Sequence, residues 1–473
     1  MEASPRVMNL VELLDKHPFG PDELLVHTED GSCTRAEIEH LVAERVERLS
    51  DAGVGERQPV AVVAHNDPAT VAWMFAVWRV GAVYVPVNPS SPPAERERTV
   101  EVTAPAVVVD ADGVERRSAA RTHAEGAAFI LWTSGTTGRP KAVVHTHEAY
   151  FELLDRVLGP MRAKPRDPAR PPMPNLIPMA LAVNAGIYNC LFALRAGTSL
   201  VLMERFRPEA FAMLVARHGI RSTVLPPAAL VMLVDDDAVE ELAPLRYVRS
   251  ITAPLSPLQA RRFTERFPGT IVLNGYGQTE IGEVIGWTAQ DAKDHPGKVG
   301  AAGRPHPGVE IRVVDAEGAP LDVDDVGHLE VRTANRTEAY ATGESVADRV
   351  TPDGFWRTGD VARLDGDGFV WIEGRVTDVI NRGGNKVFPQ QVEDTLRLHP
   401  SVVDAAVVAR IDERLGEVPV AHVVMRRGSR LDPDELEALC RRELTPYKVP
   451  VAFTEVAALP RNEAGKLLRK GLA

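Results

Sequence analysis

Alternating apolar and polar segments give the clearest structural signal between residues 59 and 87. An apolar run at residues 59–64 is followed by Asn66–Pro68, which offers a helix cap and a proline suited to the first helical turn. Apolar side chains then recur at helical spacing until Gly81, and residues 82–87 form a second apolar run. This order predicts a β–α–β unit whose two strands are parallel and buried.

The alternation continues further along the chain and then changes. It predicts strands at 199–203, 222–225 and 270–273 and helices at 211–218 and 258–267, with Pro226 and Pro227 turning the chain. Such alternation is typical of α/β layers. From about residue 299 the pattern predicts a β-rich subdomain of short strands between Gly, Asp and Pro turns, at residues 310–314, 327–332 and 369–373.

The pattern changes again after Gly374. It predicts helices at 390–398 and 433–443 and strands at 402–410 and 421–425. This stretch is long enough for a domain of its own, with a boundary near residues 374–378. We therefore expect an α/β fold: a large N-terminal domain of α/β layers with a β-rich subdomain, followed by a small α+β C-terminal domain.

Composition narrows the classes of function. The chain has 473 residues, of which 44% are hydrophobic and 25% charged, as in a globular protein of more than one domain. A formal net charge of −12 argues against nonspecific binding of nucleic acid, which needs a basic surface. Cys33, Cys190 and Cys440 show neither metal-site nor disulfide spacing. The N-terminus lacks the apolar core of a signal peptide and no stretch is expected to span a membrane, so we expect a cytoplasmic protein.

The most informative segment for chemistry is 131–145, LWTSGTTGRPKAVVH. Its small hydroxyl residues and glycines leave backbone N–H and side-chain O–H groups free to face a polyanion, and Lys141 adds a positive charge. The spacing is not that of a Walker loop, because Pro140 precedes the lysine and a strand-like AVVH follows it. This predicts a phosphate-binding loop between two strands, with a nucleoside triphosphate as its ligand.

Four further segments carry candidate chemistry. NGYGQTE, at 274–280, follows a predicted strand, where α/β proteins place ligands, and supplies an aromatic face, a hydroxyl and a carboxylate suited to Mg²⁺. FWRTGD, at 355–360, places a carboxylate in an expected tight turn, where it can accept both ribose hydroxyls. GRVTDVINRGG, at 374–384, spans the domain boundary, and PRNEAGK, at 460–466, lies near the C-terminus. Each segment alone is weak evidence for a function.

Taken in order, these segments resemble the acyl-adenylate-forming superfamily, which includes acyl-CoA synthetases, aryl acid ligases, peptide-synthetase adenylation domains and beetle luciferases. The resemblance covers nearly the whole chain and is strongest for a bacterial acyl-CoA synthetase. It implies that a carboxylate attacks the α-phosphate of ATP to give acyl-AMP and pyrophosphate, and that the acyl group then passes to a thiol. It also implies domains at 1–374 and 379–473, with the second mobile about a hinge at 375–378 centred on Thr377.

The resemblance assigns roles residue by residue. The β- and γ-phosphates of ATP are expected against Thr133, Ser134, Gly135, Thr136, Thr137, Gly138 and Lys141. Tyr276 is expected to stack on adenine, and Asp360 with Arg375 to hold the ribose. The expected catalytic residues are Thr279 at the α-phosphate, Glu280 as the Mg²⁺ ligand and Lys466 at the carboxylate and α-phosphate. Mg²⁺ and Lys⁺ would neutralise the charge of two anions that must react. Gly383 and Gly384 are expected to line the thiol's tunnel.

The segments expected to hold the acid depart from the usual pattern. Residues 251–254 read ITAP where relatives usually have GGAP, and 178–186 read PMALAVNAG, without the gating His or aromatic residue of many acyl-CoA synthetases. The Asp that amino-acid-activating members use is also missing, and an unpaired ammonium would be costly to bury. Small side chains favour a bulky apolar acid, although they are equally compatible with helix packing. The predicted pocket residues are Ala182, Asn184, Ala185, Thr252, Ala253, Gly275 and Gly277.

The sequence does not distinguish between two possible thiol acceptors, CoA and a carrier protein. CoA needs a basic cluster for its 3′-phosphate, whereas a carrier protein bearing phosphopantetheine is an acidic helical partner, and patches such as Arg426-Arg427 or Arg441-Arg442 suit either. A non-catalytic nucleotide-binding module is disfavoured because Lys466, Glu280 and Asp360 are all present, and a P-loop phosphotransferase because the Walker spacing fails. Monomer and homodimer both remain compatible with the sequence.

Overall fold

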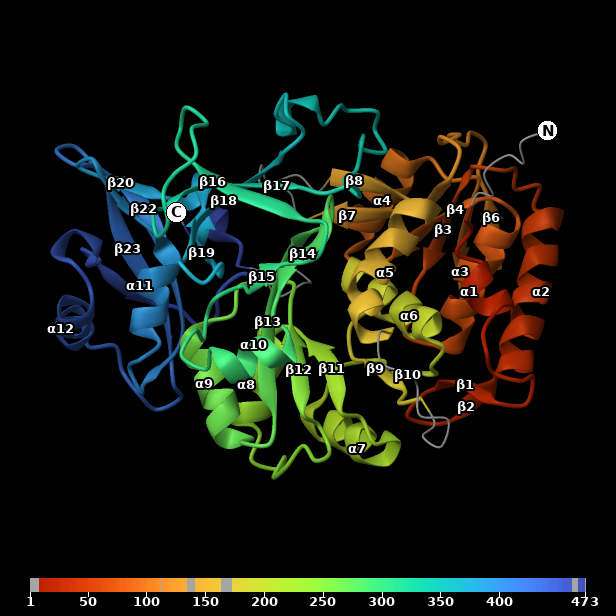
Figure 1. The fold of residues 1–473 in the computed structure, drawn as a ribbon, viewed down its shortest axis with the longest axis horizontal. Coiled ribbons are helices and arrows are strands. Elements are labelled where there is room, and N and C mark those ends of the chain that lie inside the picture. The colour runs from red at the N-terminus through yellow and green to blue at the C-terminus, as the bar shows by residue number, and fades with distance from the viewer. Residues whose placement is uncertain (1–7, 112, 134–140, 163–171, 462–466, 473) are drawn as a thin grey trace.

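The predicted β–α–β unit forms the centre of a six-stranded sheet in the computed structural model, which describes residues 8–111, 113–133, 141–162, 172–461 and 467–472 (Figure 1). Strands β3 (Pro59–Val63) and β4 (Val83–Val87) pair in parallel, and α3 (Pro68–Arg79) connects them. The Asp67 side chain caps α3 by accepting a 2.7 Å hydrogen bond from the Thr70 amide. The cap and the first-turn proline are therefore confirmed.

Two sheets and the helices around them make up the first part of the chain. The six-stranded sheet, in the order β6-β5-β3-β4-β7-β8, adds β5 (Val107–Asp110), β6 (Gly113–Arg116), β7 (Ala127–Thr133) and β8 (Lys141–Thr146). A four-stranded sheet, in the order β2-β1-β10-β9, contains β1 (Leu24–His27), β2 (Ser32–Thr34), β9 (Asn175–Ile177) and β10 (Leu200–Leu202). The accompanying helices are α1 (Glu12–Asp15), α2 (Arg35–Asp51), α4 (Pro93–Thr103), α5 (His147–Arg162) and α6 (Asn184–Ala196). A large core of buried side chains that includes Phe75, Trp78, Phe129 and Tyr150 joins these layers.

A five-stranded sheet follows, and it corrects two sequence-based expectations. Its order is β11-β12-β13-β14-β15, with β11 (Ser222–Leu225), β12 (Tyr247–Ser250), β13 (Ile271–Gln278), β14 (Gly282–Gly286) and β15 (Arg304–Pro305). Segment 274–278 is not a loop after a strand, because β13 continues through it, parallel to β12 first and antiparallel to β14 afterwards. Pro227 begins a helix rather than a turn, as a proline at the first helical position can. The helices are α7 (Pro208–His218), α8 (Pro227–Asp235), α9 (Pro257–Arg266) and α10 (Ala289–Asp294).

The predicted β-rich subdomain is a four-stranded antiparallel sheet of β16 (Glu310–Val314), β17 (Gly327–Arg332), β18 (Trp356–Leu364) and β19 (Val370–Arg375). A short 3-10 helix, η1 (Ala347–Arg349), precedes β18. Asp360 was expected in a tight turn and instead lies within β18, where Gly359 has a φ of 74°. The glycine permits this left-handed backbone, and the strand continues past it.

The C-terminal region is α+β, as predicted, and lies beside the β-rich sheet (Figure 1). Its sheet contains β20 (Ile380–Arg382), β21 (Asn385–Val387), β22 (Val402–Asp412), β23 (Gly416–Met425) and β24 (Phe453–Glu455), with helices α11 (Pro389–Leu396) and α12 (Pro433–Glu443). Three 3-10 turns complete it: η2 (Val376–Asp378), η3 (Pro446–Lys448) and η4 (Arg469–Gly471). The predicted fold class is confirmed. Among the described residues, no helix is both long and apolar enough to cross a membrane.

Candidate active site

A buried carboxylate, Asp360, is the centre of the best-defined polar cluster that contains predicted site residues. The Tyr276 hydroxyl donates to Asp360 Oδ2 at 2.5 Å, and Arg375 Nε lies 2.9 Å from Asp360 Oδ1. Asp360 and Arg375 are directly opposite each other on β18 and β19, so pairing within the sheet brings them together. Burial, followed by the neighbouring Asp360 charge, raises the pKa of Tyr276 well above its usual range, which keeps the hydroxyl protonated as a donor. Three of the predicted nucleotide-binding residues therefore meet at one place.

Gln278 completes this cluster and was not assigned a role from the sequence. Its Nε2 donates to Asp360 Oδ2 at 2.9 Å and to the Thr358 carbonyl at 2.8 Å, and its Oε1 accepts from Trp356 Nε1 at 3.0 Å. Gln278 lies within NGYGQTE, two residues after Tyr276, so its side chain leaves the same face of β13. The spacing of two residues between Tyr276 and Gln278 was the available signal. Had the strand been predicted to extend to Gln278, this spacing would have placed the two side chains on the same face.

Glu280 lies in the turn between β13 and β14 and is 8% exposed. Burial raises the pKa of its carboxyl group, while the charges of Arg349, Arg375 and Lys141 act in the opposite direction. A buried carboxylate surrounded by three cations suits a divalent metal that carries polyphosphate, because phosphate charge would balance the cations and the metal would balance the carboxylate. Among the described residues, no group of three or more His, Cys, Asp or Glu side chains is placed to hold a metal ion. Thr279 occupies the same turn.

The two strands that flank the predicted phosphate loop pair with each other. Thr133 ends β7 and Lys141 begins β8, and the two residues are opposite each other in the antiparallel register. The Thr133 hydroxyl is buried and has no hydrogen-bond partner within the part of the chain that the structure describes. Lys141 Nζ lies 2.7 Å from Glu344 Oε1 and 4.5 Å from the centre of the Tyr340 ring. The two expected flanking strands are confirmed. Ser134, Gly135, Thr136, Thr137 and Gly138 lie outside the described residues.

The first predicted acid-binding segment is held in place by Asn66. The Asn66 amide donates to the carbonyls of Met179 and Met203 at 2.8 Å each, and its oxygen accepts from the Leu181 amide at 2.7 Å. Ala182, Asn184 and Ala185 follow, and α6 begins at Asn184, whose Oδ1 accepts from the Tyr150 hydroxyl at 3.0 Å. Gly186 is required by packing, because a Cβ there would lie 2.0 Å from the Ala180 carbonyl oxygen. The segment is thus a fixed turn into a helix.

The second predicted acid-binding segment is strained. Thr252 has a φ of 81°, a conformation that suits glycine and is rare for a β-branched residue. Gly275 and Gly277 face neighbouring atoms rather than open space: a Cβ on Gly275 would lie 3.2 Å from both Glu283 Oε1 and Ile251 Cγ2, and one on Gly277 would lie 2.2 Å from the Gly282 carbonyl oxygen. Ala253, which follows Thr252, is half-buried. The glycines therefore allow close packing of β13 on β14.

A charged cluster lies beside Gly275, and its residues were not among the site residues predicted from the sequence. The Glu283 carboxylate pairs with Arg249 and lies 3.1 Å from His306 Nε2, and Arg249 Nη2 donates to the Trp287 carbonyl at 3.0 Å. The pKa of Glu283 is lowered: burial raises it, but Arg249 and His306 outweigh burial. These residues are separated widely in the chain and form no motif, so only the fold reveals them.

Three further predictions concern the boundary and the C-terminal region. Thr377 is exposed in η2, and its hydroxyl donates to Asp378 Oδ1 at 3.1 Å. Gly383 and Gly384 form the two-residue turn between β20 and β21 with φ values of 55° and 85°. A tight hairpin of this kind needs positive φ at both positions, which explains the glycine pair without a ligand. Both glycines are exposed; the Gly383 amide donates to the Leu415 carbonyl, between β22 and β23, at 2.8 Å, and a Cβ on Gly384 would face open space. Lys466 lies outside the described residues.

Comparisons with known proteins cover almost the whole chain. Residues 17–123 and 110–341 match the AMP-binding enzyme family, and residues 391–466 match the AMP-binding enzyme C-terminal domain. The chain is 28% identical to an indoleacetate–CoA ligase of Aromatoleum aromaticum, over 97% of this chain and 96% of that protein. It is 30% identical to 4-coumarate–CoA ligase 3 of Oryza sativa subsp. japonica, over 93% of this chain and 87% of that protein.

A similar solved structure is that of the amide bond synthetase McbA from Marinactinospora thermotolerans. It has a TM-score of 0.84 and 27% sequence identity, and covers 98% of this chain and 99% of that one. Sequence and structure thus agree over both the large N-terminal region and the C-terminal region. This chain belongs to the AMP-binding enzyme family and carries both the AMP-binding domain and its C-terminal domain.

Proposed function

We propose that the protein is an AMP-forming acid–thiol ligase. A carboxylate would attack the α-phosphate of ATP, forming the acyl–phosphate bond as the bond to pyrophosphate breaks, and the acyl group would then pass from AMP to the thiol of CoA. The observation that supports this most strongly is the joining of Asp360, Tyr276 and Arg375 beside the buried Glu280. Those residues provide acceptors for ribose and positive charge for phosphate in one place.

The roles of individual residues follow from charge. Glu280 would hold Mg²⁺, which supplies Lewis-acid neutralisation of phosphate charge when bound. Lys141 and the segment 133–138 would hold the β- and γ-phosphates, and Thr279 the α-phosphate. Lys466 would neutralise charge shared by the acid and the α-phosphate. Tyr276 would offer its ring face to adenine while its hydroxyl keeps Asp360 in place.

The acid is proposed to be bulky and mainly apolar, and not an amino acid. The small side chains of Ala182 and Ala185 at the start of α6 favour a bulky acid, and segment 178–186 contains no acidic side chain to pair with an ammonium group. Glu283 does not fill that role, because Arg249 and His306 already hold its carboxylate. The hinge at 375–378, the separate domains 1–374 and 379–473, and the thiol tunnel at Gly383 and Gly384 are part of the same proposal.

Two other acceptors deserve direct comparison with CoA. A carrier-protein phosphopantetheine presents the same thiol, and an amine would yield an amide from the same adenylate, as the name of the similar amide bond synthetase suggests. Pyrophosphate release with ATP, Mg²⁺ and a panel of carboxylic acids tests the first half-reaction. Mass spectrometry of the products with CoA, a loaded carrier protein or a simple amine then identifies the acceptor. Release of ADP instead of AMP would contradict the proposal.

A further inference from the structure

A buried ion pair adjoins the predicted acid site, and the proposed reaction gives it no role. Glu283, on β14, pairs with Arg249, on β12, and Glu283 Oε1 also lies 3.1 Å from His306 Nε2. Arg249 Nη2 donates to the Trp287 carbonyl at 3.0 Å. Only 11% of the Glu283 side chain and 20% of the Arg249 side chain are exposed. The carboxylate is therefore held in one place by neighbours from three segments of the fold.

The Glu283 carboxylate lies against residues that we expect to contact the acid. Gly275 and Gly286 are opposite each other on β13 and β14. A Cβ on Gly275 would lie 3.2 Å from both Glu283 Oε1 and Ile251 Cγ2, and a Cβ on Gly286 would lie 2.9 Å from the same carboxylate oxygen. Glu283 and Ile251 therefore flank the same point beside Gly275. Ile251 begins the predicted acid-binding segment 251–254.

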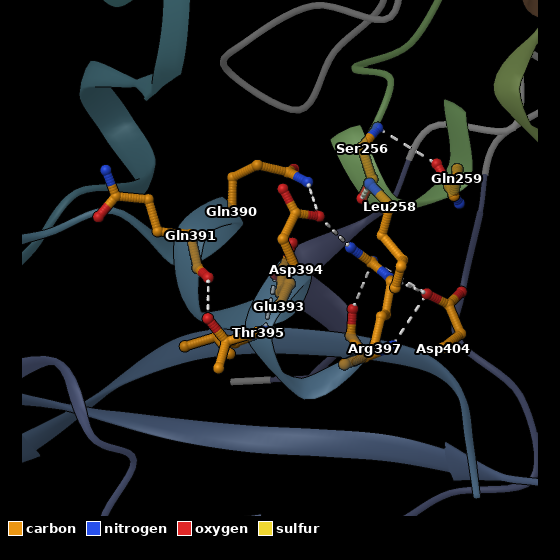
Figure 2. A network of polar contacts seen from close by, with 12 residues as sticks. Ser256, Leu258, Gln259, Gln390, Gln391, Glu393, Asp394, Thr395, Arg397 and Asp404 are labelled. Atoms are coloured by element: carbon orange, nitrogen blue, oxygen red, sulfur yellow. Dashed lines mark hydrogen bonds and ion pairs between the residues drawn. The ribbon is translucent and has the colours of Figure 1, made fainter. Parts of the chain in front are cut away.

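The segment that joins Arg249 to α9 is fixed at both ends. The ion pair and the bond to the Trp287 carbonyl hold Arg249 at one end. At the other end Ser256 caps α9: the Leu258 amide donates to Ser256 Oγ at 3.2 Å, and the Ser256 amide donates to Gln259 Oε1 at 3.3 Å (Figure 2). The strained backbone between these ends persists because its surroundings fix it. The wall of the predicted site beside the ion pair is thus set before an acid binds.

One oxygen of the Glu283 carboxylate has no hydrogen-bond partner within the described residues. Arg249 and His306 both contact Oε1, so the acceptor capacity of Oε2 is unused. A purely apolar group placed against Oε2 would remove water from a charged acceptor without replacing its hydrogen bonds, whereas a neutral O–H or N–H group would replace one.

The surrounding charges disfavour an ionised group at the same place. Arg156 Nη1 donates to the Glu283 carbonyl at 3.3 Å, so two guanidiniums, those of Arg156 and Arg249, contact this one residue. An ammonium group would meet both positive charges. An anionic group would face a carboxylate oxygen and would have no proton to donate to it. A neutral hydrogen-bond donor is the group that these contacts fit.

We propose that Arg249, Glu283 and His306 determine specificity for the acid, and that the preferred acid carries a neutral hydrogen-bond donor, a hydroxyl or N–H group, which bonds to Glu283 Oε2. This inference rests on the proposed function, because it concerns the acid used in that reaction. It narrows a bulky, mainly apolar acid to one with a single polar group besides its carboxyl group. An analogue without the donor is rejected because it leaves the carboxylate oxygen unpaired.

The test compares acid-dependent pyrophosphate release by the full-length protein with matched acids. The probes are the meta- and para-hydroxy derivatives of phenylacetic and phenylpropanoic acid, and the same acids with methyl in place of hydroxyl. Methyl is similar in size but cannot donate, so the ratio of kcat/KM values isolates the hydrogen bond. We expect kcat/KM to be about tenfold or more higher for the hydroxy acid at one position at least. Equal values at every position, or higher values for the methyl acids, would overturn the inference.

A double variant tests whether the preference comes from this ion pair. Arg249→Met combined with Glu283→Met replaces the pair by apolar side chains, an exchange that is often neutral or stabilising, and should abolish or reverse the preference. Arg312→Met combined with Glu330→Met removes a 2.7 Å ion pair of similar burial between β16 and β17 and should keep the wild-type ratio. A folded Arg249 and Glu283 double variant with the wild-type ratio would overturn the inference. Absence of pyrophosphate release with every acid would instead refute the proposed function.

Discussion

The Tyr276 hydroxyl donates a 2.5 Å hydrogen bond to Asp360 across 84 positions of sequence. Tyr276 belongs to β13, which starts in a parallel sheet and ends in an antiparallel one, while Asp360 belongs to the β-rich sheet. The bond therefore connects two sheets at the candidate nucleotide site. Tyr276 and Gln278 bond to Oδ2 of Asp360 and Arg375 bonds to Oδ1, so among the described residues three of about four acceptor positions are used and one on Oδ1 remains for a ribose hydroxyl.

Removal of this hydrogen bond should weaken the use of ATP. In Tyr276→Phe the ring remains, but Asp360 loses its shortest donor, and a hydrogen bond to a charged group contributes about 1.5–3 kcal/mol. We expect kcat/KM for ATP to fall about tenfold or more, with the fold intact by circular dichroism. Tyr84→Phe provides a matched control, since that tyrosine is buried, its hydroxyl has no partner among the described residues, and it belongs to the six-stranded sheet. An unchanged kcat/KM in Tyr276→Phe would argue against a nucleotide site at Asp360.

Glu280 should reduce stability while it supports catalysis. Its pKa is raised by burial, so at neutral pH the ionised form is disfavoured in the folded state. Glu280→Gln should therefore raise the melting temperature in the absence of nucleotide and lower Mg²⁺-dependent pyrophosphate release by on the order of a hundredfold. Calorimetry and the release assay measure the two effects. As a control, Glu344→Gln removes an exposed partner of Lys141 and should not raise the melting temperature. A lower melting temperature in Glu280→Gln would contradict the prediction and show that the buried carboxylate stabilises the fold.

His145 should produce part of the acid sensitivity of the fold. Burial lowers its pKa to about 4, and its ring stacks on Phe129 with centroids 5.0 Å apart. Between about pH 6.5 and pH 4 the unfolded chain binds a proton that the folded protein does not, so stability falls as pH falls, by about 1.4 kcal/mol per pH unit for one such group. His145→Phe should make the plot of unfolding free energy against pH less steep by that amount. Chemical denaturation at several pH values measures the slope, and equal slopes in the two proteins would refute a His145 that stays neutral in the folded protein.

Thr252 should be a site of stored strain. A β-branched residue at a φ of 81° costs about 1–3 kcal/mol, and glycine relieves this at a smaller cost in chain entropy. Thr252→Gly should raise the unfolding free energy by about 1 kcal/mol and change the ranking of acids in the release assay. Ala104→Gly, at a φ of 44° after α4, provides a comparison without a β-branched side chain and should stabilise less. A destabilised Thr252→Gly would mean that the threonine side chain makes a compensating contact.

The sequence was most informative where local rules decide the structure. Asp67 and Pro68 fix the start of α3, and the strands on either side of the predicted phosphate loop follow from their apolar pattern. The predictions were wrong where pairing between strands that are not fixed by local sequence decides the structure. Asp360 sits in a strand because β18 pairs with β17 and β19, and residues 274–278 stay extended because β14 supplies new partners.

The same distinction applies to the site. Tyr276, Asp360 and Arg375 were predicted from motifs, and the fold places them in contact. Gln278 was missed because its role depends on the extended strand, and Arg349 because no motif marks it, although its charge acts on Glu280. Gly383 and Gly384 were interpreted as ligand-facing, and their positive φ values provide a sufficient structural reason for both glycines.

The central claim is acid-dependent adenylation with Lys466 in a catalytic role. The most direct measurement is the nucleotide product, together with pyrophosphate, from ATP and Mg²⁺ with and without a carboxylic acid, in the wild-type protein and in Lys466→Ala. With the wild-type protein we expect AMP and pyrophosphate in equal amounts, formed only when an acid and a thiol acceptor are present in excess. In Lys466→Ala we expect the rate of pyrophosphate release to fall about a hundredfold or more, equivalent to about 2.7 kcal/mol. Formation of ADP, or near-normal pyrophosphate release by Lys466→Ala, would contradict the claim.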